Sequence, residues 1–88
     1  MHLTRHAEHR SIKRNIPMHV MDAIYEFGSP HPSRGLLSLT LDRKAIDLAA
    51  EDKVRRRHEL CRYSGTYLIV DNEEQIVTVA RRTRRFRH

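Results

Sequence analysis

The chain of 88 residues has one cysteine, no tryptophan, three glycines and three prolines. The single thiol, Cys61, excludes an intrachain disulfide, and we expect it to be a small core residue. The apolar stretches of the chain are far shorter than the roughly 20 residues that cross a bilayer, and no apolar signal segment is apparent. The glycines lack the spacing of a phosphate-binding loop. We therefore expect an intracellular, cytoplasmic protein with no membrane partner.

Positive charge is what the chain has in excess. Lysine and arginine number 17 against 11 acidic residues, which gives a net charge of +6. A chain of this length forms one domain, here residues 1–88, with a thin core. Clustered cations favour a polyanionic partner, which can be a nucleic acid, an anionic membrane face or an acidic protein. The alternative is that the charge only keeps a small protein soluble.

The clearest structural signal is a β-hairpin near the end of the chain. Residues 66–70 and 75–80 are two β-branched runs, and the polar residues 71–74 between them are typical of a turn. The second run leads directly into the arginine-rich residues 81–88. The hairpin therefore delivers a dense group of cations to one place.

Two helices are predicted before the sheet. Thr4 can cap a first helix over roughly residues 4–14, whose apolar residues are few. Pro17 begins a second helix that ends at Gly28, and residues 28–35 are expected to form a linker. The apolar side chains expected to dock these helices are Leu3, Ala7, Ile12, Val20, Met21, Ala23, Ile24 and Phe27.

A strand and a third helix are predicted in the middle of the chain. Residues 37–41 alternate between leucine and Ser or Thr, which indicates a half-buried strand. Asp42 then caps a helix that runs to about Cys61, with an inner face formed by Ile46, Ala49, Ala50, Val54, Leu60 and Cys61. The predicted fold class is α+β, with two N-terminal helices, a third helix and an antiparallel three-stranded sheet ending in a C-terminal hairpin.

Several of these segments resemble a bacterial family catalogued as domain of unknown function 4258. Residues 4–10 read Thr-Arg-His-Ala-Glu-His-Arg, which is similar to that family's Thr-x-His-Ala-x-x-Arg, and Arg-x-Ile follows at residues 14–16. Residues 39–42, 67–70 and 76–79 are also similar to one branch of it. That branch has Gly-His-Arg where this chain has Ala80-Arg81-Arg82, which argues against a general acid or base at this strand end.

The resemblance implies a fold and a function. The family is similar to the RelE, ParE and BrnT toxins, which are small basic α+β proteins of bacterial toxin–antitoxin pairs. The RelE and BrnT types cleave RNA without a metal, whereas the ParE type poisons gyrase. A small RelE/BrnT-like domain, RNA as substrate and an acidic antitoxin as protein partner are therefore expected.

Metal-independent RNA cleavage needs a base, a phosphate clamp and an acid. His6 is the candidate base or acid because imidazole titrates near neutrality, and Arg10 and Arg82 complete the predicted catalytic set because guanidinium matches phosphate geometry. The further residues predicted to bind RNA are Lys13, Arg14, Arg56, Tyr67, Arg81, Arg84 and Arg85. Phe86 among these arginines could stack on a base.

Each of these residues also has a purely structural interpretation. His6 can hydrogen-bond a neighbouring carbonyl, and the terminal arginines can form a solvated tail. Seven histidines suggest a zinc site, but structural zinc usually needs thiolates or four converging ligands, so neither a metal nor another cofactor is predicted.

Three functions therefore remain open. The first is a toxin-like, metal-independent endoribonuclease. The second is a non-catalytic basic module, which binds nucleic acid or inhibits another protein and could be carried by a phage. The third is a gyrase poison. The oligomeric state is not indicated by the sequence.

Overall fold

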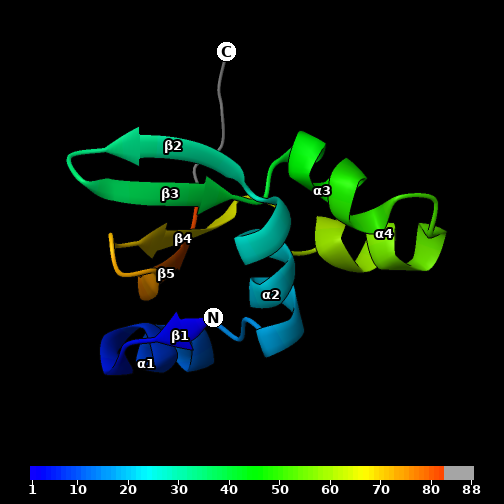
Figure 1. Cartoon of the computed structure of the whole chain (residues 1–88). Coiled ribbons are helices and arrows are strands. Elements are labelled where there is room, and N and C mark those ends of the chain that lie inside the picture. The colour runs from blue at the N-terminus through cyan, green and yellow to red at the C-terminus, as the bar shows by residue number, and fades with distance from the viewer. Residues whose placement is uncertain (83–88) are drawn as a thin grey trace, which may run out of the picture.

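The computed structural model describes residues 1–82, which form a small α+β domain of four helices and one five-stranded mixed sheet (Figure 1). The predicted Arg84, Arg85 and Phe86 contacts lie outside the described residues. In chain order the elements are β1 (His2–Leu3), α1 (Arg5–Lys13), α2 (Met18–Phe27), β2 (Ser29–Ser33), β3 (Leu36–Thr40), α3 (Arg43–Ala50), α4 (Val54–Cys61), β4 (Thr66–Val70) and β5 (Gln75–Arg81).

The sheet has the strand order β1-β5-β4-β3-β2. The predicted β4–β5 hairpin and the pairing of β3 with β4 are confirmed, both antiparallel. The prediction of a three-stranded sheet is wrong, because a strand is added at each edge. At one edge β1 pairs in parallel with β5, with His2 opposite Gln75 and Leu3 opposite Ile76.

The strand β2 at the other edge replaces the predicted linker. It pairs with β3 in antiparallel register, with Pro30 opposite Leu39 and Pro32 opposite Leu37. Proline cannot donate to a ladder, so it is tolerated at an edge, where one side of the strand needs no partner. The two prolines therefore mark an edge strand here rather than a loop.

The first helices begin where the sequence predicts. The Thr4 hydroxyl accepts a hydrogen bond from Ala7 N at 3.2 Å and so caps α1, and Pro17 is the N-cap of α2. The inner face of α1 is set by Ala7 and Ser11, which are both buried. Ile12 follows Ser11 by a rotation of about 100°, so it is 69% exposed and the prediction of a core role is wrong.

The predicted third helix is two helices, α3 and α4, joined by a sharp turn at Glu51. Glu51 has a φ of 54° and a ψ of −119°, and Lys53 N donates to Ala50 O at 2.9 Å to close the turn. One straight helix from residue 43 to 61 would be about 28 Å long. A five-residue strand covers only about 17 Å, so the turn is what allows Leu60 to reach the core.

The change of direction at Glu51 also corrects part of the predicted inner face. Asp42 caps α3 as expected, accepting from Ala45 N at 2.9 Å, and Leu60 is buried. Val54, however, is 66% exposed, and Cys61 is exposed rather than in the core. The spacing between Ile46 and Val54 would place both on one face of a continuous helix. Because α3 and α4 are separate helices, the two residues do not share a face.

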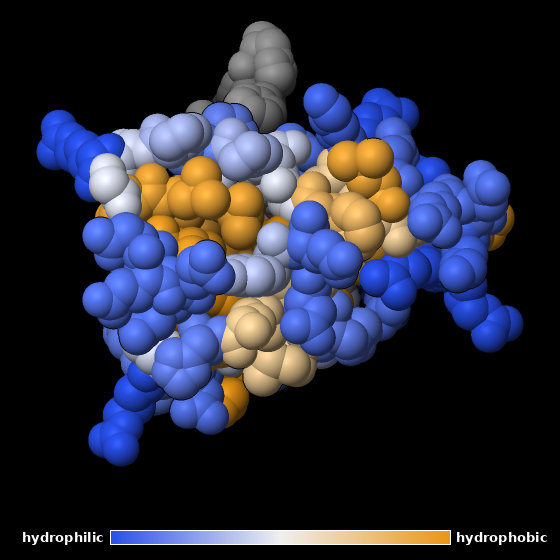
Figure 2. Space-filling view, viewed as in Figure 1, coloured by the Kyte–Doolittle hydropathy of each residue, from blue (hydrophilic) through white to orange (hydrophobic). Residues whose placement is uncertain are grey.

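The helices pack on one face of the sheet, here called the core face. α2 crosses β3 and β4, α1 lies along β5, and α3 and α4 extend the layer beyond α2 (Figure 1). The largest fully buried apolar side chains are Val20, Met21, Ile24, Leu41, Leu60, Leu68, Ile76 and Val79. Beside α2 an apolar area of the surface remains uncovered, seen as orange in Figure 2. None of the helices in residues 1–82 is both long and apolar enough to cross a membrane.

Candidate nucleic-acid interface

The face of the sheet opposite the core carries mainly polar side chains. Thr66, Leu68 and Val70 are buried, whereas Tyr67 and Ile69 between them are half-buried, because successive strand residues point to opposite faces. The strand register extends this second face across four strands. This surface, called the polar face below, consists of His31, Ser38, Thr40, Tyr67, Ile69, Thr78 and Ala80.

A groove of about 610 Å³ lies at one end of the polar face. It is formed by β2, β3, the start of α3, the turn before β4 and the end of β5. Its lining residues are His31, Pro32, Ser33, Ser38, Thr40, Asp42, Arg43, Ser64, Gly65 and Arg82. This sheet groove thus combines two guanidinium groups, one imidazole and one carboxylate with several hydroxyl groups.

Arg82 is held in the sheet groove by two interactions. Its backbone N donates to Gly65 O at 3.0 Å, and its guanidinium carbon lies 5.6 Å from the centre of the Tyr67 ring. A cation within about 6 Å of a ring centre is attracted to the face of the ring. The structure therefore brings together Arg82 and Tyr67, which were both predicted to contact RNA. A guanidinium stacked in this way still presents N–H groups at its edge.

The arginines of the sheet groove form no ion pair with an acid among residues 1–82. The ion pairs found within residues 1–82 are His19 with Glu59, on α2 and α4, and Arg57 with Asp47, on α4 and α3. Neither pair reaches the sheet groove. Arg82 is thus available to an anionic ligand as far as residues 1–82 are concerned.

Asp42 is the carboxylate of the sheet groove, and it has a structural task. It accepts hydrogen bonds from Ala45 N and from the Ser29 hydroxyl, both at 2.9 Å. Burial alone would raise its pKa, but these hydrogen bonds outweigh burial and hold the pKa below its ordinary value, and the charge of His31 acts in the same direction. Asp42 therefore stays ionised and fixes the junction of β2 and α3.

The other predicted catalytic residues lie elsewhere. His6 is exposed and Arg10 is half-buried, both on α1, and neither lines the sheet groove. The Nε of Arg10 is buried and has no hydrogen-bond partner among residues 1–82. Lys13 and Arg14, at the end of α1, are exposed. A catalytic set of His6 and Arg10 with Arg82 is therefore not assembled in the sheet groove, and their role stays a prediction.

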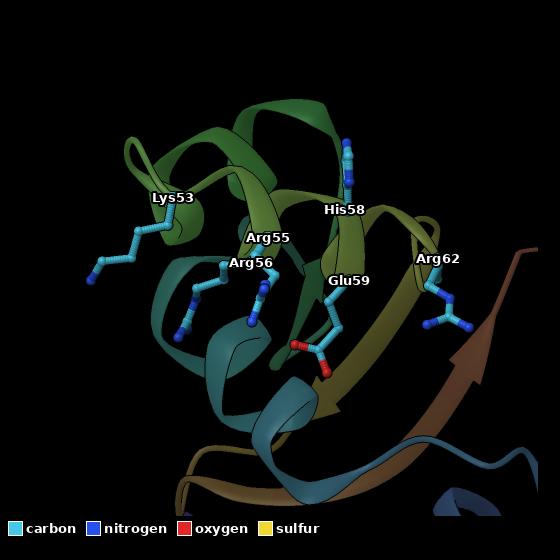
Figure 3. A pocket seen from close by; sticks show the side chains of 6 residues that line it. All are labelled: Lys53, Arg55, Arg56, His58, Glu59 and Arg62. Atoms are coloured by element: carbon cyan, nitrogen blue, oxygen red, sulfur yellow. The ribbon is translucent and has the colours of Figure 1, made fainter.

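Arg81 and Arg56 occupy two further positions. The guanidinium of Arg81 donates to Ser64 O at 3.3 Å and to Arg62 O at 2.6 Å, so Arg81 braces the segment before β4. Arg56 lies on α4 in a second groove of about 760 Å³, called the α4 groove below (Figure 3). Its lining residues are Lys53, Arg55, Arg56, His58, Glu59 and Arg62.

Two residues of the sheet groove were missed by the sequence analysis. His31 lies in the segment taken as a linker, and Arg43 directly follows the predicted cap Asp42. A signal for the polar face was present, because Ser38 and Thr40 alternate with the leucines of β3. The position of β2 beside β3 could not be derived from that alternation. Within residues 1–82, no three His, Cys, Asp or Glu side chains are grouped so that they could hold a metal ion.

Comparison with known protein families, with characterised proteins and with solved structures finds no match to this chain. The resemblance described above and its functional implications therefore remain predictions. The function is therefore inferred from the geometry of the sheet groove.

Proposed function

We propose that the protein binds single-stranded RNA at the sheet groove. The observation that carries this proposal is the cation–π contact of Arg82 with the ring of Tyr67, beside a groove that Arg82 lines together with Arg43 and His31. Single-stranded RNA is recognised by stacking unpaired bases on aromatic or guanidinium planes and by cationic contacts to phosphate. Tyr67 and Arg82 provide the plane, and the guanidinium groups of Arg82 and Arg43 provide contacts to phosphate.

The charge of the whole chain supports a nucleic-acid ligand. A net charge of +6 on 88 residues attracts a polyanion, and arginine contacts to phosphate release counterions, so binding should weaken steeply with salt. The sequence after Arg82 continues with three further arginines, at positions 84, 85 and 87. These arginines contribute to the net positive charge of the chain.

A second candidate function, metal-independent cleavage of the bound RNA, is favoured by the presence of His31 in the same groove. In this reaction His31 takes the proton of a 2′-hydroxyl group. The 2′-oxygen then attacks the adjacent phosphorus, the bond to the 5′-oxygen breaks, and solvent protonates the departing oxygen. Arg82 and Arg43 would stabilise the charge that builds up on the phosphate. His31 would thus take the role that the sequence analysis assigned to His6.

The toxin-like endoribonuclease and its acidic antitoxin partner remain part of this proposal, and they are supported by the family resemblance. A cytoplasmic location stays a prediction from the sequence. A non-catalytic binding module uses the same groove without the role of His31. A gyrase poison would instead alter DNA supercoiling, which a supercoiling assay measures directly.

The binding proposal is tested by fluorescence anisotropy with a labelled single-stranded RNA of about eight nucleotides, within the range of known site sizes. We expect Arg82→Ala to weaken binding at least about tenfold, or 1.4 kcal/mol. Arg5→Ala is the matched control, because Arg5 is an exposed arginine of α1 outside both grooves. An equal loss of RNA affinity in the two variants would mean that only net charge matters, and it would contradict the proposal.

Cleavage is tested on a long labelled RNA in EDTA. We expect His31→Ala to bind RNA as the parent does and to lose cleavage, and His6→Ala to retain both properties. Loss of cleavage in His6→Ala but not in His31→Ala would contradict the role of His31 and support the predicted catalytic role of His6. If the parent binds and never cuts, the protein is a binding module.

A further inference from the structure

The α4 groove carries charge that the sheet-groove proposal does not use. Four of its six lining residues are lysine or arginine. In Figure 3 the side chains of Lys53, Arg55 and Arg56 extend from the start of α4 toward one side, and Arg62 stands at the far end of the helix beside β5. Figure 2 shows hydrophilic side chains gathered over this part of the molecule. The cations thus follow the length of α4.

The one acid that lines the α4 groove, Glu59, also contacts a residue of another helix. Glu59 Oε2 lies 2.6 Å from His19 Nε2 and joins α4 to α2. Residues 53–57 include four cations and no acid, although the start of a helix carries a partial positive charge that disfavours cations. Lys53, the N-cap, makes no side-chain capping bond within the described chain. An anion in this groove would relieve that repulsion.

The segment 62–65 contributes residues to both the α4 groove and the sheet groove. Arg62 lines the first, whereas Ser64 and Gly65 line the second. The guanidinium of Arg81 bonds the carbonyl oxygens of Arg62 and Ser64, at 2.6 and 3.3 Å. Arg81 therefore fixes the junction and adds a cation there. Only three peptide bonds separate Arg62 from Gly65, and no acidic residue lies in segment 62–65.

We propose that the two grooves form one cationic track, which runs from Lys53 along α4, past Arg62 and Arg81, to Arg43 and Arg82. The track binds one RNA strand that spans both grooves. This inference rests on the proposed function and specifies its ligand as an extended strand rather than a short oligonucleotide. Because most of the residues that line the α4 groove are cations, and none is Phe, Tyr or Trp, we expect its contacts to be mainly to phosphate, and such contacts are independent of base sequence.

The test compares RNAs of about 4 and about 12 nucleotides, which bracket known site sizes for single strands. The track variant is K53Q/R55Q/R56Q, and the control is R5Q/R34Q/K44Q, which removes three exposed cations that line neither groove. Both triple variants lose the same charge. Circular dichroism and thermal unfolding verify that each is folded before anisotropy is measured.

We expect the parent to bind the longer RNA at least tenfold more tightly than the shorter one. The track variant should lose most of that difference, bind the short RNA within twofold of the parent, and show a salt slope lower by about 0.7 for each phosphate contact removed. The control should retain the difference between the two RNAs.

Three results would overturn the track. They are equal affinities of the parent for the two RNAs, equal losses in the two triple variants, and an equal loss for both RNAs in the track variant. In each case the sheet-groove function still stands if Arg82→Ala weakens binding of the short RNA. If the parent binds neither RNA, the proposed function fails together with the track.

Discussion

The two faces of the sheet are built from alternate residues of the same strands, yet they serve different ends. On β4, Leu68 is fully buried on the core face, whereas its neighbour Tyr67 is half-buried on the polar face and stacks with Arg82. The helices pack on the core face, and the sheet groove lies on the polar face. Under the proposed function, stability and RNA binding therefore depend on different neighbouring residues of the same strand.

The largest expected effect is on the core face. Leu68→Ala removes a side chain that is 0% exposed, and a buried leucine-to-alanine change costs about 2–5 kcal/mol of unfolding free energy. Urea denaturation of parent and variant measures this loss. In the fraction that remains folded, RNA affinity should be unchanged. A loss of RNA affinity in Leu68→Ala without a loss of unfolding free energy would contradict the separate roles of the two faces.

On the polar face the expected effect is on binding. Tyr67→Leu keeps an apolar side chain but removes the ring that Arg82 faces, so base stacking worth about 1–3 kcal/mol should be lost from RNA binding. The free energy of unfolding should change by less than about 1 kcal/mol, since the cation–π contact at a partly exposed site contributes no more than that. Tyr25→Leu serves as the matched control, because Tyr25 is a half-buried tyrosine of α2 that packs against the core cluster and lines neither groove. An equal loss of binding in the control would contradict the role of Tyr67.

Asp42 caps α3 and also lines the sheet groove, and its substitution is expected to have a smaller effect on stability. Asp42→Ala removes the cap of α3 and should cost about 1 kcal/mol. Because hydrogen bonds hold the Asp42 pKa below its ordinary value of 3.8, the ionised carboxylate stabilises the fold above that pH. This contribution disappears as the pH falls through the folded pKa.

The pH dependence provides the check. Denaturation followed from pH 6 down to about pH 2 should show a smaller loss of stability in Asp42→Ala than in the parent, since the variant lacks the group whose pKa changes on folding. Parallel curves for the two proteins would contradict the assigned hydrogen bonds.

The smallest expected effect lies outside both faces, at the turn between α3 and α4. Glu51→Gly should stabilise the protein by up to about 1 kcal/mol, because glycine adopts a positive φ without the strain that a side chain causes. Glu8→Gly, at an exposed position inside α1, should instead cost about 1 kcal/mol. Thermal unfolding should therefore shift in opposite directions in the two variants. A shift in the same direction would contradict the strain assigned to Glu51.

Local chemistry made part of this fold predictable. Thr4 and Asp42 cap helices, and the alternation of β3 separates core leucines from Ser38 and Thr40. The turn of the last hairpin is likewise local, with the Asp71 carboxylate accepting from Glu73 N and Gln75 N at 2.9 Å.

The features that were missed depend on contacts between distant segments or on strain. The pairing of β1 with β5 joins residues more than seventy positions apart, and two residues are too few to show any periodicity. The break between α3 and α4 at Glu51 could not be predicted, because no glycine or proline lies near it in the sequence. For the candidate site, Arg82 and Tyr67 could be predicted from their types, whereas His31 enters the groove only because a proline-containing edge strand is laid beside β3.

The location of the RNA site is tested most directly by NMR, by mapping the backbone amide shifts of the parent protein as a short single-stranded RNA is added. We expect the largest changes at Thr40, Gly65, Tyr67 and Arg82, around the sheet groove. Changes confined to α1, around His6 and Arg10, with the sheet groove unaffected, would contradict the proposed site.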